Sequence, residues 1–135
     1  MPLLDWKDYE FIQVLSVVPT NEEGARYTFE VVKGGAKLTL IVWPYESVVG
    51  VCVGTDSLPD PLTTFAVFVR GKALLQEYKD ECWLELRDCV VAPSRFSYLD
   101  WGDPFDRVSF PHGQPIRVWV DPQIRVEWRR ANETS

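Results

Sequence analysis

The densest cluster of carboxylates in the chain is a short aspartate-rich loop. Asp100, Asp103 and Asp106 recur at every third residue, and Trp101 stands beside the first of them. Acidic loops supply the several oxygen ligands that Ca²⁺ prefers, but aspartate next to glycine or proline also favours ordinary turns. We interpret the loop mainly as turn chemistry and expect no metal or cofactor. We name Trp101, Asp100, Asp103 and Asp106 as a candidate surface for a protein partner.

Two further tryptophans are out of phase with the apolar residues around them. Trp119 shares a strand face with Arg117, and Trp83 shares one with Glu85 and Arg87. A solvent-facing tryptophan among charges often anchors a protein interface. The alternative is that a second layer, such as the N-terminal segment, covers these faces. We list both tryptophans as candidate binding residues.

Motifs for catalysis are absent from the sequence. His112 is the one histidine and lies between proline and glycine, which is typical of a turn. A lone histidine cannot build a multi-histidine metal site, and there is no G-x-S-x-G, P-loop, G-x-G-x-x-G or H-E-x-x-H pattern. Carboxylates are too numerous for an acid/base pair to be singled out. We therefore assign no catalytic residue and predict that the protein is not an enzyme.

The cysteines and the N-terminus predict a cytoplasmic protein. Cys52, Cys82 and Cys89 all lie among apolar residues without a C-x-x-C pair, which favours reduced, buried thiols. Charged residues interrupt the first eight positions, so they do not resemble a signal peptide, and no apolar run approaches ~18 residues. We expect no membrane association.

The order of apolar and polar residues is mostly that of β-strands. Residues 26–32 and 38–42 alternate on either side of Gly34-Gly35, which predicts a tight hairpin. The apolar phase slips by one residue within 81–91, which predicts a bulge near Arg87-Asp88. Further strands are expected at 47–54, 64–69 and 73–78, and residues 115–120 and 124–128 should form a last hairpin.

The N-terminal stretch is less regular. Residues Asp5 to Gln13 are consistent with one or two helical turns capped by Asp5, and Gln13 to Val18 is predicted as the first strand. Eight or nine short strands predict an all-β antiparallel fold, a β-sandwich or an open barrel. We expect one β domain over residues 1–130 and a frayed tail over 131–135.

Charge sets the kind of partner. The chain has 135 residues, 14 Lys and Arg and 20 Asp and Glu, for a net charge of −6. Nucleic-acid binding starts from clusters of lysine and arginine, so an acidic chain disfavours it. An acidic surface suits a basic protein partner.

We predict a non-catalytic protein that acts through a protein–protein interface. The prediction rests on the size of the chain, its acidity, its tryptophan content and its lack of catalytic motifs. In these bulk properties the chain resembles bacterial immunity proteins, which block a cognate toxin, and small phage-encoded inhibitors. The resemblance spans the whole chain but rests on no motif, so it transfers no residue roles. One alternative is a Ca²⁺- or carbohydrate-binding β-sandwich module, similar in plan to C2 domains. Another is a structural subunit of a homo-oligomer, so monomer and homodimer both stay open.

Overall fold

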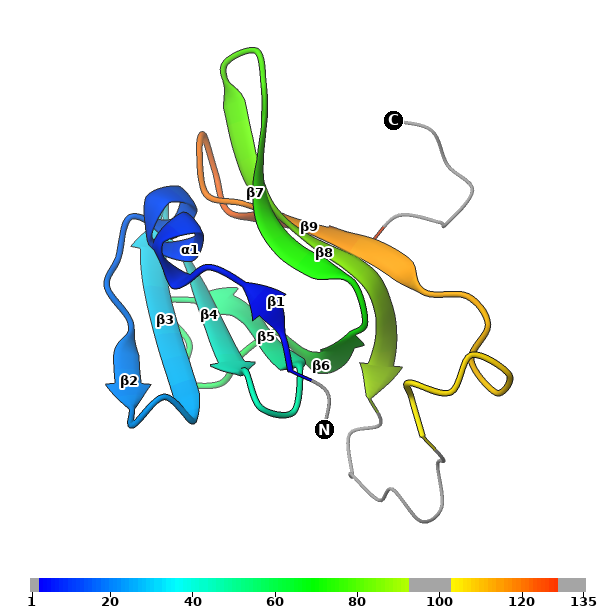
Figure 1. Ribbon diagram of the computed structural model, residues 1–135. Helices are drawn as coiled ribbons and strands as arrows, with labels where there is room; N and C mark the ends of the chain where they lie inside the picture. The colour runs from blue at the N-terminus through cyan, green and yellow to red at the C-terminus, as the bar shows by residue number, and fades with distance from the viewer. Residues whose placement is uncertain (1–2, 93–102, 129–135) are drawn as a thin grey trace.

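A computed structural model describes residues 3–92 and 103–128 of the chain. Figure 1 shows one sheet that curls into a half-barrel around a short helix. The all-β fold is confirmed, and the curled sheet matches the open-barrel alternative better than the sandwich. In chain order the elements are β1 (Asp5–Trp6), α1 (Asp8–Leu15), β2 (Thr20–Glu22), β3 (Arg26–Lys33), β4 (Ala36–Trp43), β5 (Val48–Thr55), β6 (Thr63–Val69), β7 (Lys72–Tyr78), β8 (Glu81–Ala92), β9 (Gln114–Trp119) and β10 (Arg125–Trp128).

The order of strands in the sheet depends on β8. β2 to β6 pair as consecutive antiparallel neighbours, and β6 then pairs with the second half of β8. β7 pairs with the first half of β8, so β6 and β7 lie end to end along it. β9 pairs with β8, and β10 pairs with β9. The short β1 is parallel to β7, which departs from the wholly antiparallel sheet that the sequence predicts.

The bulge predicted near Arg87-Asp88 is confirmed. Leu86 pairs with Ile116 and Cys89 pairs with Gln114, so the register shifts between these two pairs. Asp88 has a φ of +57°, and an extra residue of this kind bends a strand. The bulge lies where β8 changes its neighbour from β7 to β6.

The Gly34-Gly35 hairpin is also confirmed. The two glycines have φ values of +62° and +81°, which side chains disfavour, and they join β3 to β4. The last hairpin forms as predicted, with β9 and β10 antiparallel. Lys33 at the end of β3 forms an ion pair with Asp121 in the turn of that hairpin.

The predicted strand from Gln13 to Val18 is wrong, because α1 runs to Leu15. The helix begins after Lys7 rather than at a cap by Asp5, which belongs to β1. It ends at Ser16, which has a φ of +60° and donates its N–H to the Ile12 carbonyl at 2.8 Å.

The helix forms where it does because its apolar face fills the hollow of the half-barrel. Phe11, Val14 and Leu15 follow helical spacing, and all three are buried. The Phe11 ring packs against Phe29 of β3 with centroids 5.6 Å apart. Burying a side chain of this size contributes about 2–3 kcal/mol.

The β7–β8 hairpin extends beyond the rest of the sheet. Its strands stay paired out to Tyr78 and Glu81, and Figure 1 shows the hairpin projecting at the top. Residues 77–81, which we call the hairpin tip, are all exposed. The half-barrel therefore carries one β-hairpin that projects away from the rest of the sheet.

Candidate functional site

Trp83 and Trp119 lie side by side on the outer face of the sheet. The register pairs their neighbours Leu84 and Val118, which belong to the core, so the tryptophans face the opposite way. The two ring centroids are 5.7 Å apart, and the side chains are only 9% and 3% exposed. The N-terminal helix packs on the inner face, so it does not cover them.

Two arginines cover the tryptophan pair. The Arg125 guanidinium lies 3.8 Å above the centre of the Trp119 ring, and that of Arg117 lies 5.2 Å from the Trp83 ring. Each such cation–π contact is worth about 0.5–2 kcal/mol. A partner that approached this face would therefore meet guanidinium groups before indole rings.

Glu85 holds the next row of this face together. Its Oε2 accepts from Arg87 Nε at 2.8 Å, and its Oε1 accepts from Arg117 Nε at 3.1 Å. Burial raises the pKa of Glu85, but the two arginines outweigh burial and the pKa is lowered overall. Glu85 is thus held as a carboxylate at neutral pH, unlike a proton donor for catalysis.

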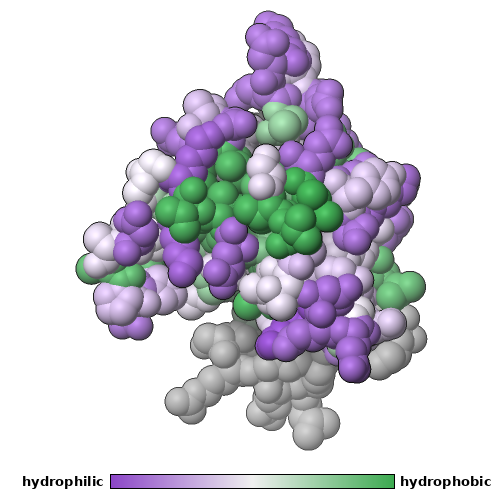
Figure 2. Space-filling model, turned by 90° about the vertical axis from the view of Figure 1, so that its left-hand side faces the viewer, coloured by the Kyte–Doolittle hydropathy of each residue, from purple (hydrophilic) through white to green (hydrophobic). Residues whose placement is uncertain are grey.

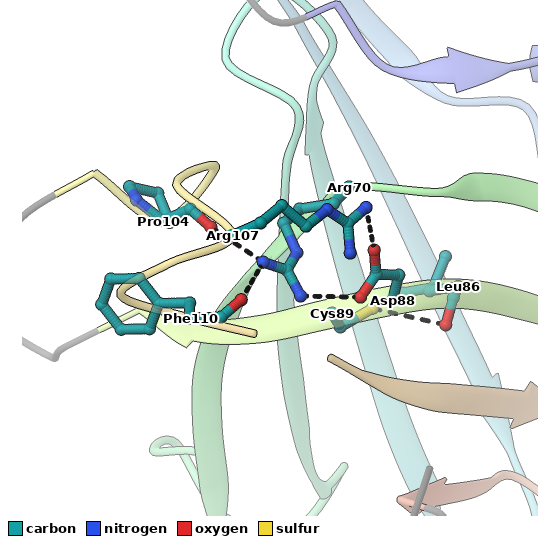
Figure 3. A network of polar contacts seen from close by, with 7 residues as sticks. All are labelled: Arg70, Leu86, Asp88, Cys89, Pro104, Arg107 and Phe110. Atoms are coloured by element: carbon teal, nitrogen blue, oxygen red, sulfur yellow. Dashed lines mark hydrogen bonds and ion pairs between the residues drawn. The ribbon is translucent and has the colours of Figure 1, made fainter. Parts of the chain in front are cut away.

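A buried arginine fastens the loop 103–113 to the bulge of β8 (Figure 3). The Arg70 side chain is 2% exposed and donates to the carbonyls of Pro104, at 3.4 Å, and Phe110. It also pairs with Asp88 Oδ1 at 2.7 Å, while Arg107 of the loop pairs with Asp88 Oδ2 at 2.6 Å. One carboxylate thus joins the strand to the loop through two arginines.

The described aspartates of this loop bond to the loop itself. Asp103 accepts the N–H of Phe105, and Asp106 accepts the N–H of Val108, each at 2.9 Å. The Ser109 hydroxyl donates to the other oxygen of Asp106, and these bonds lower the pKa of Asp106. Both carboxylates thus stabilise turns by accepting nearby backbone N–H groups, as the sequence predicted for this loop.

A partner role for the predicted site residues stays a prediction. Asp100 and Trp101 lie outside the described residues, as does the predicted tail 131–135. The structure brings Trp83 and Trp119 together and sets them apart from the aspartate loop.

The Arg70 network was not predicted from the sequence. Arg70 meets Asp88 and Phe110, which are 18 and 40 residues further along the chain, and no local pattern reports such a contact. The bulge predicted from the sequence includes Asp88, but nothing in the sequence indicated that Arg70 would pair with it.

The described residues provide no obvious place for a metal ion. Within 3–92 and 103–128, no three His, Cys, Asp or Glu side chains cluster closely enough to hold one. The acidic loops at 54–61 and 103–113 lie at opposite ends of β6, roughly 20 Å apart for a seven-residue strand. In a C2-like module the acidic loops would lie together at one end of the sheet and bind a cation between them. These two loops are too far apart to do so.

The cysteines differ in burial. Cys89 is buried and donates its Sγ–H to the Leu86 carbonyl at 3.3 Å, and burial raises the pKa of its thiol. Cys52 and Cys82 are half-buried, and all three are free thiols. A thiol with a raised pKa is a poor nucleophile.

Two apolar surfaces are exposed elsewhere. Figure 2 looks onto the side that carries α1, β2 and β3, where hydrophobic residues gather in a band bordered by hydrophilic ones. A shallow groove of about 280 Å³ lies between β4, β5 and β6, lined in part by Ile41, Trp43 and Ala66. No helix in the described ranges is long and apolar enough to cross a membrane.

No protein-family model and no curated protein matches this sequence. The fold is similar to a chain of a solved structure, the contact-dependent growth inhibition toxin–immunity protein complex from Klebsiella pneumoniae 342. The TM-score is 0.64, and the match covers 96% of this chain and 98% of that chain at 9% sequence identity. The similarity is thus one of fold over nearly the full length of both chains.

Proposed function

We propose that this chain is a non-catalytic protein that binds another protein and blocks it, as an immunity protein does. The observation that carries the proposal is the full-length fold similarity to a chain of a toxin–immunity complex. The similarity supports a protein partner because that chain comes from an assembly of two proteins. The fold similarity covers 96% of this chain, so it includes the whole half-barrel and is not limited to a few loops.

The chemistry of the described residues supports binding rather than catalysis. Glu85 is held ionised by two arginines, and Cys89 is buried with a raised thiol pKa. His112 is exposed in a loop that is fastened to the sheet by other residues. Nucleophilic attack needs a thiol whose pKa is lowered, and proton donation needs a carboxyl whose pKa is raised, whereas Cys89 and Glu85 are shifted in the opposite directions.

The charge of the chain favours a basic partner. A net charge of −6 attracts a basic surface and raises the rate of encounter with it. Asp103 and Asp106, with Asp100 and Trp101 beside them in the sequence, remain a candidate contact. Arg87 and Arg125 are exposed on the face that carries Trp83 and Trp119. A cytoplasmic location remains a proposal from the sequence.

Affinity capture from the native host tests the proposal. The tagged full chain is incubated with lysate at 100 mM salt, and bound proteins are identified by mass spectrometry. We expect one stoichiometric basic protein, whose expression alone slows growth and whose effect is relieved by co-expression of this chain.

Light scattering on the same preparation reports whether the chain is a monomer or a homodimer. A protein that binds but keeps its full effect on growth would reject the blocking role. A chain that captures nothing and forms stable homo-oligomers would favour the structural-subunit alternative.

A further inference from the structure

The hairpin tip makes no contact that the fold needs. Its five residues, 77–81, are all exposed, and Tyr78 is 63% exposed. Among the described residues, the one side-chain interaction of the tip is internal, with the Lys79 ammonium 5.4 Å from the Tyr78 ring. In Figure 2 the tip projects at the top as a hydrophilic protrusion.

A ribbon of this kind adds little to folding stability. An isolated two-stranded hairpin is marginal in water, and ordering each residue costs about 1–2 kcal/mol of backbone entropy. The tip buries almost no surface to offset that cost. Its projection is therefore better explained by a contact outside the chain.

The root of the hairpin holds the tip in a defined direction. Trp83 of β8 pairs with Gln76 of β7 and packs against the tilted ring of Trp119 of β9, while Leu75 packs against the core. The tryptophan pair thus joins the hairpin to a third strand just below the tip. A preorganised tip loses less entropy on binding than a free loop would.

The tip has the composition of an anchor for a basic surface. Glu77, Asp80 and Glu81 carry three negative charges against the one positive charge of Lys79, for a net charge of −2. Tyr78 and Glu81 form a cross-strand pair, so they share one face. Tyrosine is enriched among residues that dominate binding energy, and carboxylates at its rim select basic partners.

We propose that the hairpin tip inserts into a basic cleft of the partner protein. Tyr78 enters an apolar pocket of that cleft, and the carboxylates pair with lysines and arginines at its rim. This inference rests on the proposed function, because it names the surface that engages the blocked protein. The same carboxylates would repel the phosphates of nucleic acids and of anionic lipids, which disfavours those partners.

The test compares two tyrosines in matched surroundings. Tyr9 is 57% exposed with Lys7 6.0 Å from its ring, so Tyr9→Ala is a control for Tyr78→Ala. Both tyrosines are exposed, so both variants should keep the wild-type melting temperature. The probe is the protein captured by the wild-type chain, purified and titrated by calorimetry. We expect Tyr78→Ala to raise the Kd at least 20-fold and Tyr9→Ala to change it less than 3-fold.

The charge contribution is tested by neutralising the tip. One variant replaces three tip carboxylates by their amides, and its control replaces three exposed carboxylates elsewhere, so that the net charge changes equally. The tip set is Glu77→Gln, Asp80→Asn and Glu81→Gln, and the control set is Glu23→Gln, Glu46→Gln and Asp60→Asn. We expect the tip set to weaken binding more and to flatten its dependence on salt between 50 and 300 mM.

The outcomes separate this inference from the proposed function. Partner capture by the wild-type chain with equal Kd values for Tyr78→Ala and Tyr9→Ala overturns the role of the tip and leaves the proposed function standing. Equal loss from both amide sets shows that only net charge acts, which also overturns it. Failure of the wild-type chain to capture any protein overturns both.

Discussion

Removing the Arg70 guanidinium tests whether the buried network holds the loop 103–113. Arg70→Met keeps the length and packing of the stem but removes the donor to Asp88 Oδ1 and to the Phe110 carbonyl. Breaking a buried ion pair by removing one partner costs about 3–5 kcal/mol. We expect the lower end, about 3 kcal/mol, because Asp88 is 24% exposed and retains Arg107.

The control is the second arginine on the same carboxylate. Arg107 is 61% exposed, so Arg107→Met should cost less than about 1 kcal/mol. Urea unfolding at pH 7, followed by tryptophan fluorescence, measures both. With a slope of about 1.5–2 kcal/mol per molar urea, Arg70→Met should lower the midpoint by about 1.5–2 M. Limited proteolysis should also cut the loop faster in that variant.

A midpoint shift below about 0.5 M for Arg70→Met would refute this reasoning, as would equal shifts for the two variants. Equal shifts would mean that burial of the Arg70 guanidinium adds nothing to the pairing. Fast cleavage of the loop in the wild-type chain would contradict its attachment directly.

Two further predictions concern ionisation and thiol reactivity. Because its arginines lower the pKa of Glu85 from an ordinary value of 4.5, the stability they contribute is present above that pH and is lost as the pH falls through the lowered pKa. Glu85→Gln should therefore cost about 1.5 kcal/mol at pH 7, and urea unfolding should show this difference shrinking below pH 4.5; a constant difference would contradict the ionic origin. Iodoacetamide should label Cys52 and Cys82 in the native state but Cys89 only after unfolding, as read by mass spectrometry, and early labelling of Cys89 would contradict its burial.

Local signals in the sequence were sufficient for much of the strand pattern. Gly34-Gly35 supports positive φ without strain, so the β3–β4 hairpin follows from two residues and the alternation around them. The slip of apolar phase near Arg87-Asp88 reports a bulge because an extra residue moves every later side chain to the other face. Neither inference needs a distant contact.

The end of the helix was harder to predict because the residues around it are compatible with both a helix and a strand. Residues 13–18 contain enough valine and leucine to suggest a strand. The hollow of the half-barrel decided otherwise, since Phe11, Val14 and Leu15 fill it together only from a helix. Tertiary packing overrides local propensity in segments this short.

The sequence by itself determined the alternation of apolar and polar residues along most strands, the position of the Gly34-Gly35 turn and the acidity of the chain. Those properties follow from side-chain alternation, from backbone sterics and from composition, all of which are local. Only the tertiary structure decided that β6 and β7 share the edge of β8, that Arg70 meets Asp88, and that Trp83 and Trp119 are covered by arginines. These are contacts between residues far apart in the chain, and their formation depends on how the whole sheet curls.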